Sequence, residues 1–380
     1  MEYQSFLITG GCGLQGSSIV ETLRSRYPSC RNIAVLTRDP SLNLFPGVAY
    51  HRGDLTSPAD IDRCLQACRP TVIFHCAAVV TGTRKPVSDE VVNAINVGGT
   101  QLLLAACARL GGVRAFVFTS SVAVVQRPGV EIRGANETWP LIDFVNDRET
   151  LVYPKSKAEA ETLVLAADGA DGEGKGEGRE GGCSMRTCAV RPSAVYGERD
   201  NDVTPLVMRT AKTMRGLQIG DNKNPMATTY VGNSTHAHLL AAERLLDPDP
   251  AVRDAVGGQA FFVANEGAST FWDLARTIWF HAGAGPDPRD PAEYRPEDLR
   301  VVSVGLAMWA AWASEWWAWL WGSTPRISRI AVGIVTMTRV YDISKAKRVL
   351  GYSEQVGWEE GCRRAARWWV ENRGEDKKTK

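Results

Sequence analysis

A glycine-rich turn near the start of the chain limits the fold more than any other feature. Gly10, Gly13 and Gly16 follow a strand-like run at residues 5–9 and lead into a helical pattern. A turn without Cβ atoms lets backbone N–H groups and a helix N-terminus approach a pyrophosphate closely. We therefore predict a strand–turn–helix unit that binds a dinucleotide through Gly10, Gly11, Gly13, Leu14 and Gly16.

Short apolar runs alternate with helical patterns over the first two-thirds of the chain. Several of these runs are apolar throughout, as expected of parallel strands that are buried on both faces. The alternation predicts an α/β fold with a Rossmann-type, doubly wound parallel sheet. We expect its strands at residues 5–9, 32–37, 48–51, 71–75, 115–119, 187–191 and 260–264.

The pattern also suggests a division of the chain into two parts. Prolines interrupt the rhythm after residue 191, so we expect a dinucleotide-binding domain over residues 1–191. Residues 192–370 then form mainly a smaller C-terminal substrate lobe, from which the strand near 260–264 returns to the sheet. Residues 168–182 hold seven glycines and seven charged residues, which predicts a flexible surface insertion. Residues 371–380 read as a polar tail.

Composition excludes several classes of protein. The 44 basic and 43 acidic side chains nearly cancel, and no basic run offers a nucleic-acid site. The nine cysteines are odd in number and scattered, unlike a disulfide framework. Cys64 and Cys68 lack a second pair at ligand spacing, so we expect no metal site. No signal peptide precedes the first predicted strand, and we expect a cytosol-facing protein.

Residues 301–322 form an unusual apolar segment. They contain six tryptophans and a single charged residue, Glu315. About 20 residues suffice to span a bilayer, but the internal charge and the preference of tryptophan for the headgroup level favour a helix lying in the membrane interface. A hydrophobic hairpin packed on the second lobe and a spanning helix are the alternatives. Trp309, Trp312, Trp316 and Trp319 recur at helical spacing and would line one face.

A tyrosine and a lysine four residues apart form the candidate catalytic pair. Tyr153 and Lys157 open a helical stretch and fall on one helix face. A phenol with a pKa near 10 becomes a usable base when an ammonium and a bound nicotinamide cation stabilise its phenolate. Ser120 and Ser121 end the predicted fifth strand and would lie at the carboxyl edge of the sheet, where doubly wound folds bind ligands.

The spacing Gly-x-x-Gly-x-x-Gly resembles the extended branch of the short-chain dehydrogenase/reductase superfamily. The resemblance implies that Asp54 and Leu55 hold the adenine ring. It further implies that Cys76, Ala77 and Ala78 run beneath the cofactor. Ser121 matches the serine that hydrogen-bonds the substrate oxygen beside Tyr153, with Ser120 as the near alternative. Asn96 matches the asparagine that holds a water linked to the lysine, although a helix-capping role fits it equally well.

The end of the second predicted strand bears on the choice of cofactor. An acidic residue there would bind the ribose hydroxyl of NAD, but this chain has Thr37 followed by Arg38. A guanidinium suits the additional phosphate of NADP, so we favour NADP. Asp39 keeps NAD as the alternative, because a shift of one residue would bring its carboxylate to the ribose.

Further motifs make the resemblance closer. Together with the Tyr153 motif they resemble the 3β-hydroxysteroid dehydrogenase family, and within it the decarboxylating sterol-4α-carboxylate 3-dehydrogenases. The resemblance implies NAD(P)-dependent oxidation of a 3β-hydroxyl on a fused-ring sterol or terpenoid, with loss of a C-4 carboxylate where one is present. It also implies that Pro192 borders the nicotinamide and that the enzyme associates with the endoplasmic reticulum membrane. The matching segments are residues 119–122, 137–140, 220–224, 230–233, 238–243, 261–266 and 346–352.

Other functions stay open at this point. The Thr37–Arg38 pair, the tryptophan density and the glycine insertion favour a relative acting on a triterpenoid, steroid-like or meroterpenoid intermediate, in the direction of oxidation or of ketone reduction. An NADPH-dependent carbonyl reductase of the flavonoid-reductase type is one alternative. A dinucleotide-binding redox sensor without turnover is another, which the intact Ser121, Tyr153 and Lys157 oppose. The sequence leaves the oligomeric state open, and a homodimer is compatible with it.

Overall fold

The computed structural model describes residues 1, 4–30, 32–80, 87–147, 149–169 and 184–373. Within these ranges, seven parallel strands form one sheet in the order β11-β7-β5-β4-β1-β2-β3. Each predicted strand lies within one residue of the observed one, which confirms the Rossmann-type doubly wound fold. The strands are β1 (Phe6–Thr9), β2 (Ile33–Thr37), β3 (Ala49–Arg52), β4 (Val72–His75), β5 (Ala115–Thr119), β7 (Arg186–Pro192) and β11 (Gln259–Val263).

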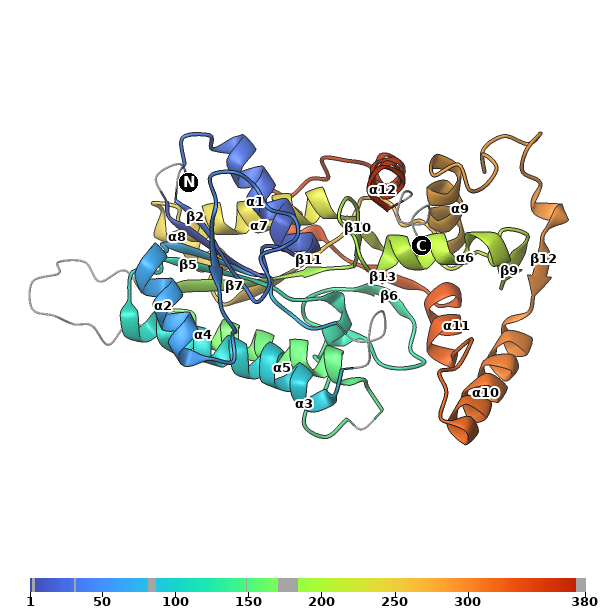
Figure 1. Ribbon diagram of the computed structural model, residues 1–380, viewed down its shortest axis with the longest axis horizontal. Helices are drawn as coiled ribbons and strands as arrows, with labels where there is room; N and C mark the ends of the chain where they lie inside the picture. Colours follow the sequence, from blue (N-terminus) through green and yellow to red (C-terminus); the bar gives the residue numbers. More distant parts are fainter. Residues whose placement is uncertain (2–3, 31, 81–86, 148, 170–183, 374–380) are drawn as a thin grey trace, which may run out of the picture.

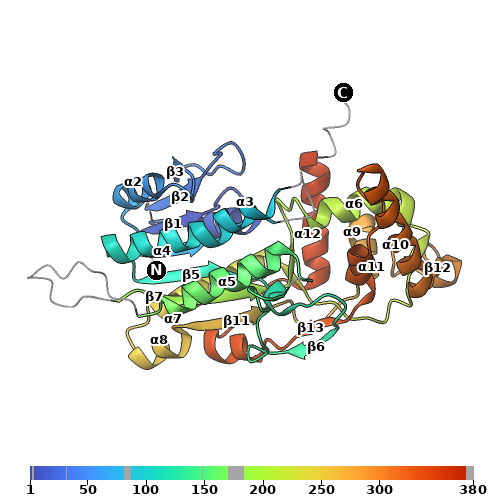
Figure 2. The ribbon, with the colours of Figure 1, turned by 90° about the horizontal axis from the view of Figure 1, so that it is seen from below.

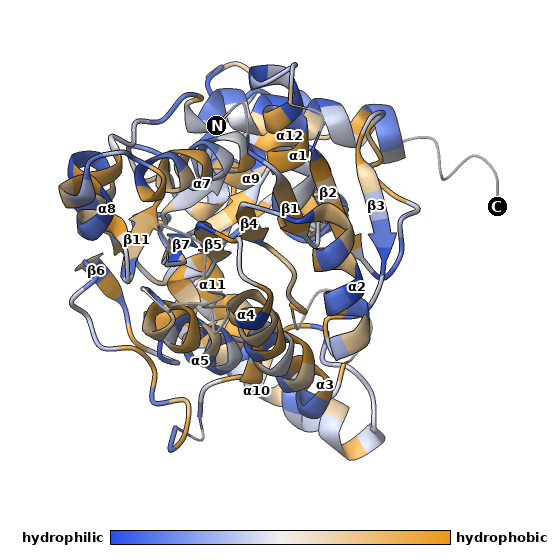
Figure 3. Ribbon diagram, turned by 90° about the vertical axis from the view of Figure 1, so that its left-hand side faces the viewer, coloured by the Kyte–Doolittle hydropathy of each residue, from blue (hydrophilic) through white to orange (hydrophobic). Residues whose placement is uncertain are grey.

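Helices cover both faces of this sheet, as Figure 3 shows with the strands seen nearly end-on. Phe6 and Ile8 of β1 pack in one apolar cluster with α1 and α7, whereas Leu7 packs in another with α2, α4 and α5. Successive side chains of a strand point to opposite faces, so an apolar strand requires a helical layer on each side. These helices are α1 (Leu14–Arg26), α7 (Val231–Leu245), α2 (Pro58–Cys68), α4 (Gly99–Leu110) and α5 (Val152–Ala166).

The helix before α4 is irregular. A short helix, α3 (Asp89–Asn93), passes through one π-helical turn, η1 (Ala94–Gly98), into α4. Among the described residues, the stretch from Asp89 to Leu110 is the one helix long and apolar enough to cross a membrane, and half of it is buried inside the molecule. Its packing against α2 and α5 is that of a core helix of the α/β unit.

Elements after residue 192 build most of a second apolar core, which includes the buried Trp272 and Trp279. Most of them lie to one side of the sheet in Figures 1 and 2, whereas α7, α8 and β11 pack on the sheet or belong to it. Two short parallel strand pairs, β8 with β10 and β9 with β12, help to frame this core, and a third pair joins β6 to β13. The strands are β6 (Ile132–Ala135), β8 (Ala194–Tyr196), β9 (Leu217–Ile219), β10 (Thr228–Tyr230), β12 (Arg300–Val302) and β13 (Arg339–Tyr341). The helices are α6 (Val203–Met214), α8 (Pro250–Val256), α9 (Phe271–His281), α10 (Val304–Trp321), α11 (Arg329–Thr336) and α12 (Trp358–Arg373).

The structure describes the three remaining predicted segments, namely the insertion, the tail and the tryptophan-rich segment, to different extents. Most of the predicted insertion at 168–182 lies outside the described residues, as do residues 374–380 of the predicted tail. Residues 371–373 complete α12 instead of starting the tail. The tryptophan-rich segment forms α10, whose N-terminus is capped by Ser303.

Candidate active site

The glycine turn connects β1 to α1 with little space around its backbone. Gly10 has a φ of +68°, and an added Cβ would lie 2.8 Å from the Cα of Ala77. At Gly16 an added Cβ would collide with the carbonyl oxygen of Gly10. Both positions therefore require glycine, because neither backbone atom can move without opening the turn.

The N-terminus of α1 fits an anionic ligand. Gly13 is the exposed N-cap residue and Leu14 is the first residue of the helix, and no side chain accepts a hydrogen bond from this end. The first N–H groups of a helix need partners, and a pyrophosphate is a suitable one. Gly11 is buried below, where an added Cβ would strike the side chain of Val35. The turn has the shape and the donors that a dinucleotide requires.

The segment after β4 packs directly on this turn. The N–H of Cys76 donates to the carbonyl of Thr9 at 3.2 Å, and the N–H of Ala77 donates to the Thr9 hydroxyl at 3.3 Å. Ala77 and Ala78 are half-buried. These bonds hold the backbone of Ala77 against Gly10, so the segment lies beside the predicted cofactor site.

Asp54 and Leu55 follow β3. Leu55 is buried, while Asp54 is half-buried and accepts hydrogen bonds from the N–H and the hydroxyl of Thr56, both at 2.8 Å. The Asp54 N–H donates to Asp60 at 2.9 Å. The carboxylate of Asp54 is therefore held in a fixed turn. Its oxygens can still accept a hydrogen bond from an adenine amino group.

The end of β2 exposes both candidate ribose-binding residues. Thr37 is half-buried, whereas Arg38 and Asp39 are exposed. Burial raises the pKa of the Cys12 thiol. A hydrogen bond with Thr37 acts to lower this pKa, and the Asp39 carboxylate acts to raise it further. Asp39 thus acts electrostatically on the glycine turn itself, and both residues stay candidates for the 2′ position of the ribose.

Ser121 and Tyr153 lie together at the carboxyl end of β5. Ser121 caps a short 3-10 helix, η2 (Val122–Val125), by accepting from the N–H of Ala123 at 3.1 Å. Burial raises the pKa of Tyr153 to about 12, although a hydrogen bond with Ser121 acts to lower it. Ser120 is 3% exposed, and its hydroxyl has no hydrogen-bond partner among the described residues. The structure therefore brings Ser121, and not Ser120, to the tyrosine.

Lys157 is buried deeply beside this pair. The residue is 2% exposed, and its Nζ donates a hydrogen bond to the carbonyl of Thr119 at 2.5 Å. The same nitrogen lies 3.9 Å from the centroid of the Phe118 ring. Burial lowers the pKa of Lys157 to about 7, and the acidic groups of Cys76 and Glu161 oppose this decrease. The amine consequently changes its charge in the neutral pH range.

Asn96 lies within the π-helical turn η1, a feature that is frequent at functional sites. Its side-chain oxygen accepts from the N–H of Val79 at 2.8 Å, and its Nδ2 donates to the Val79 carbonyl and to Ser156 Oγ. Ser156 in turn donates to the Tyr153 carbonyl at 2.8 Å. Asn96 thus ties the segment after β4, at Val79, to the start of α5, which carries Tyr153.

Two buried histidines near Lys157 were not predicted from the sequence as site residues. His238 Nδ1 contacts the Ser234 carbonyl at 2.7 Å, so this nitrogen carries the proton and Nε2 accepts from the Thr119 hydroxyl at 2.8 Å. His75 bridges the hydroxyls of Thr9 and Thr100. Burial lowers the pKa of His75 to about 3 and that of His238 to about 4, and the Lys157 charge contributes. Both histidines are neutral and brace the strand ends.

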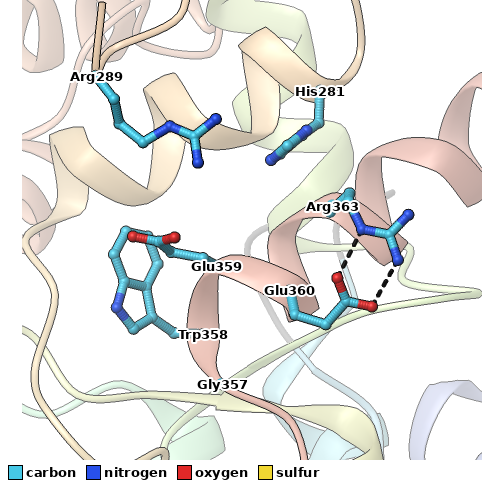
Figure 4. Close-up of a pocket in the computed structure, with 7 residues that line it drawn as sticks. All are labelled: His281, Arg289, Gly357, Trp358, Glu359, Glu360 and Arg363. Carbon is cyan, nitrogen blue, oxygen red and sulfur yellow. Dashed lines mark hydrogen bonds and ion pairs between the residues drawn. The ribbon is translucent and has the colours of Figure 1, made fainter.

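A well-formed cavity in the described part of the chain lies away from this cluster. A cavity of about 440 Å³ lies between the end of α9 and the start of α12, where Arg363 pairs with Glu360 at 2.6 Å (Figure 4). None of the candidate catalytic or cofactor-binding residues lines this cavity. Its charged groups of both signs neutralise one another, and Arg289 already pairs with Asp287 at 3.0 Å. Within the described ranges, no group of three or more His, Cys, Asp or Glu side chains could hold a metal ion.

Comparison with known proteins decides the family. The model of the 3-beta hydroxysteroid dehydrogenase/isomerase family matches residues 7–289. The chain belongs to this family. It is 32% identical to a decarboxylating sterol-4-alpha-carboxylate 3-dehydrogenase of Saccharomyces cerevisiae, over 96% of this chain and 97% of the yeast protein. It is also 32% identical to a 3 beta-hydroxysteroid dehydrogenase/Delta 5→4-isomerase of Mycobacterium tuberculosis, over 91% of this chain and 85% of that one.

Solved structures agree with this fold. A UDP-glucose 4-epimerase of Thermotoga maritima has a TM-score of 0.67 at 18% identity, with 97% of this chain and 99% of that one covered. The Thermus thermophilus UDP-glucose 4-epimerase in complex with NAD has a TM-score of 0.63 at 23% identity, with 96% and 98% covered. These likenesses show that the chain shares the fold of these epimerases. Membership in the 3β-hydroxysteroid dehydrogenase family confirms the main prediction and disfavours both the flavonoid-reductase type and a sensor without turnover.

Replacing Gly10 with alanine tests the glycine turn. The change places a Cβ against the Ala77 backbone and strains a positive φ, so we expect the free energy of unfolding to fall by about 1–3 kcal/mol. Dinucleotide affinity, measured by calorimetry, should be lost. Gly47→Ala is the matched control, because Gly47 has a φ of +76° but no atom within 4 Å of an added Cβ. Wild-type affinity in Gly10→Ala would contradict the assignment of the turn to the pyrophosphate.

Proposed function

We propose that this protein is an NAD(P)-dependent dehydrogenase that oxidises a 3β-hydroxyl to a ketone on a sterol-like fused-ring substrate, with loss of a C-4 carboxylate where the substrate has one. The observation that carries the proposal is the near full-length similarity to the yeast decarboxylating 3-dehydrogenase, in a chain that joins Ser121 to Tyr153 beside a buried Lys157.

The residues of the chain have distinct roles in this reaction. The dinucleotide, when bound, supplies the acceptor for the hydride that leaves C3. Tyr153, as phenolate, takes the proton of the substrate hydroxyl, and Ser121 donates a hydrogen bond to the same oxygen. The ammonium of Lys157 favours the phenolate against the burial that raises the pKa of Tyr153 to about 12.

Decarboxylation follows from the product of the oxidation. A substrate with a 4-carboxylate becomes a β-keto acid, whose carboxylate can leave as carbon dioxide because the 3-ketone accepts the electron pair as an enolate. Ser121 and the protonated Tyr153 are then hydrogen-bond donors to the enolate oxygen. The same two side chains thus serve both steps.

Replacing Tyr153 with phenylalanine tests the chemistry. We expect turnover of a 3β-hydroxy-4-carboxy sterol to fall roughly 10²- to 10⁴-fold, because the general base is lost. Mass analysis of the ketone product measures this turnover. Dinucleotide affinity should stay near that of the wild type. Tyr27→Phe is the control, since Tyr27 bonds to Glu243 at 2.5 Å, away from Ser121. Unchanged turnover in the Tyr153 variant would refute the role of the phenol.

For the cofactor, we propose NADP in preference to NAD. The support is the exposed guanidinium of Arg38 next to a residue, Thr37, that carries no charge to repel a 2′-phosphate. Asp39, also exposed, is the residue that would serve NAD.

The exchange Arg38→Glu tests this preference. Hydrogen bonds between a guanidinium and a phosphate are strong, so we expect NADP affinity, measured by fluorescence titration of the reduced form, to fall roughly tenfold or more. NAD affinity should be equal or higher. Asp39→Asn is the companion variant and should leave NADP affinity unchanged. If Arg38→Glu binds NADP as the wild type does, Arg38 is not the phosphate ligand.

We also propose that α10 attaches the protein to the cytosolic surface of the endoplasmic reticulum membrane. All six tryptophans of this helix are exposed, from 52% for Trp316 to 77% for Trp319. Three alanines of the helix are buried, and two of them, Ala307 and Ala311, belong to the apolar core of the second lobe. Tryptophan rings favour the interface of a bilayer, where apolar and polar surroundings meet.

The charges around α10 suit the same location. Its one charged residue, Glu315, pairs with Arg329 at 2.7 Å, so the helix brings no unpaired charge to the lipid. Exposed arginines precede and follow the helix at Arg300 and Arg326, and anionic headgroups attract such side chains. The helix lies at the far end of the molecule from α2, where a flat surface can reach it (Figure 1).

Exchanging three exposed tryptophans for glutamine tests the attachment. In a Trp309, Trp316 and Trp319 triple variant the folded core is untouched, so we expect sedimentation with vesicles containing anionic phospholipid to fall roughly tenfold or more. The control is a variant with Leu42 and Val145 changed to glutamine, which are 65% and 77% exposed but lie outside α10. Equal sedimentation of the triple variant and the wild type would refute the proposal, as would equal sedimentation of a chain lacking residues 301–322.

A further inference from the structure

One face of α5 carries a third functional group beyond the tyrosine and the lysine. Glu161 follows Lys157 by four residues, as Lys157 follows Tyr153, so the three side chains share one helix face. Glu161 is 0% exposed and forms a bidentate ion pair with Arg191, at 2.5 and 2.9 Å. Arg191 is 4% exposed and belongs to β7, where it directly precedes Pro192.

A buried ion pair needs a reason other than stability. Removing two charges from water costs free energy that their attraction often fails to recover, and apolar side chains of similar size are commonly as stable. The pair here has no access to solvent, and Arg191 Nη1 has no hydrogen-bond partner among the described residues. What an apolar pair in the same place would not provide is a charge on the helix that carries Tyr153 and Lys157.

The groups that face Lys157 show what this position provides. From β4 come His75 and Cys76, and from α7 comes His238. Burial holds the pKa of His75 and of His238 well below neutrality and raises that of Cys76 to about 12, so all three are uncharged between pH 6 and 9. On α5 itself, Tyr153 is a neutral phenol in the same range while no dinucleotide is bound, because burial raises its pKa to about 12. Among these groups, Glu161 alone supplies a negative charge.

We propose that Glu161 is a positioning residue whose carboxylate stabilises the Lys157 ammonium, and that Arg191 holds this carboxylate one helical turn away from the amine. Without Arg191, the buried carboxylate would be free to bind the amine directly. With Arg191, the carboxylate is fully bonded, and Lys157 keeps its contacts with Thr119 and Phe118.

The inference deepens the proposed function, since the charge of Lys157 matters for catalysis only if Lys157 assists Tyr153. Its test therefore has a readout apart from activity. In protein labelled with ¹³C at the lysine ε-carbons, the Lys157 signal is assigned with Lys157→Arg and titrated with pH. We expect the titration of Lys157 to move down by about one pH unit or more in a variant combining Glu161→Gln with Arg191→Met. This variant removes both charges and avoids an unpaired buried guanidinium.

The pH profile of substrate oxidation should change with it. Activity that needs a protonated Lys157 should decline at a lower pH, with the same displacement as in the titration. In Glu161→Gln alone the displacement should be larger, because the unpaired Arg191 adds a positive charge. The matched control combines Asp168→Asn with Arg186→Gln. That ion pair, at 3.0 Å, joins the other end of α5 to the start of β7 and should leave Lys157 unaffected.

The outcomes separate the two proposals. An unchanged Lys157 titration in the double variant overturns the inference, and so does a loss of activity without a shift, because the pair would then be only structural. A shift equal to that of the Asp168 and Arg186 control also overturns it. A shifted titration in a protein that oxidises no 3β-hydroxy substrate would leave the inference standing and refute the proposed function.

Discussion

A buried ammonium is the constraint on which the active site depends. Lys157 is 2% exposed, and a charge at this depth is costly unless neighbouring groups compensate it. The compensation comes from separate elements: the carbonyl of Thr119 at the end of β5, the face of the Phe118 ring and the carboxylate of Glu161 on α5. The parallel sheet makes this arrangement available, because the carboxyl ends of its strands meet at one edge. The pKa of Lys157, which burial lowers to about 7, therefore depends on contacts that several elements of the fold bring together.

The sequence predicted the sheet well because parallel strands buried on both faces leave a strong signal. Largely apolar runs of four or five residues, as in β1, β2, β4, β5 and β11, can be recognised without knowledge of their partners. The glycine turn was recognisable for a similar reason, since Gly10 and Gly16 are required by contacts within a few residues of sequence or with one neighbouring segment. Features that local geometry determines are readable in a single chain.

The polar contacts around Lys157 depend on pairs distant in sequence, and the sequence did not reveal them. Thr119 meets His238 across 119 positions, and Glu161 meets Arg191 across 30. A buried histidine looks the same in a sequence whether it braces a strand or only fills the core. The choice between Ser120 and Ser121 likewise depends on the backbone after β5, which turns at Ser121 to start η2. One signal was available for Glu161: its four-residue spacing from Lys157 continues the spacing of the catalytic pair.

The second lobe links α10, the helix that we propose for contact with lipid, to the edge of the sheet that carries the candidate active site. Ala307 and Ala311 of α10 share an apolar cluster with Val332 of α11 and with Tyr196 at the end of β8. β8 begins two residues after Pro192, the last residue of β7. The buried residues of α10 are all alanines, so the helix is held close to this core, because small side chains allow close packing. The surface that we propose for contact with lipid thus shares one packed core with β8, which closely follows the strand that ends at the candidate active site. Such a connection suits an enzyme that acts on a sterol-like substrate.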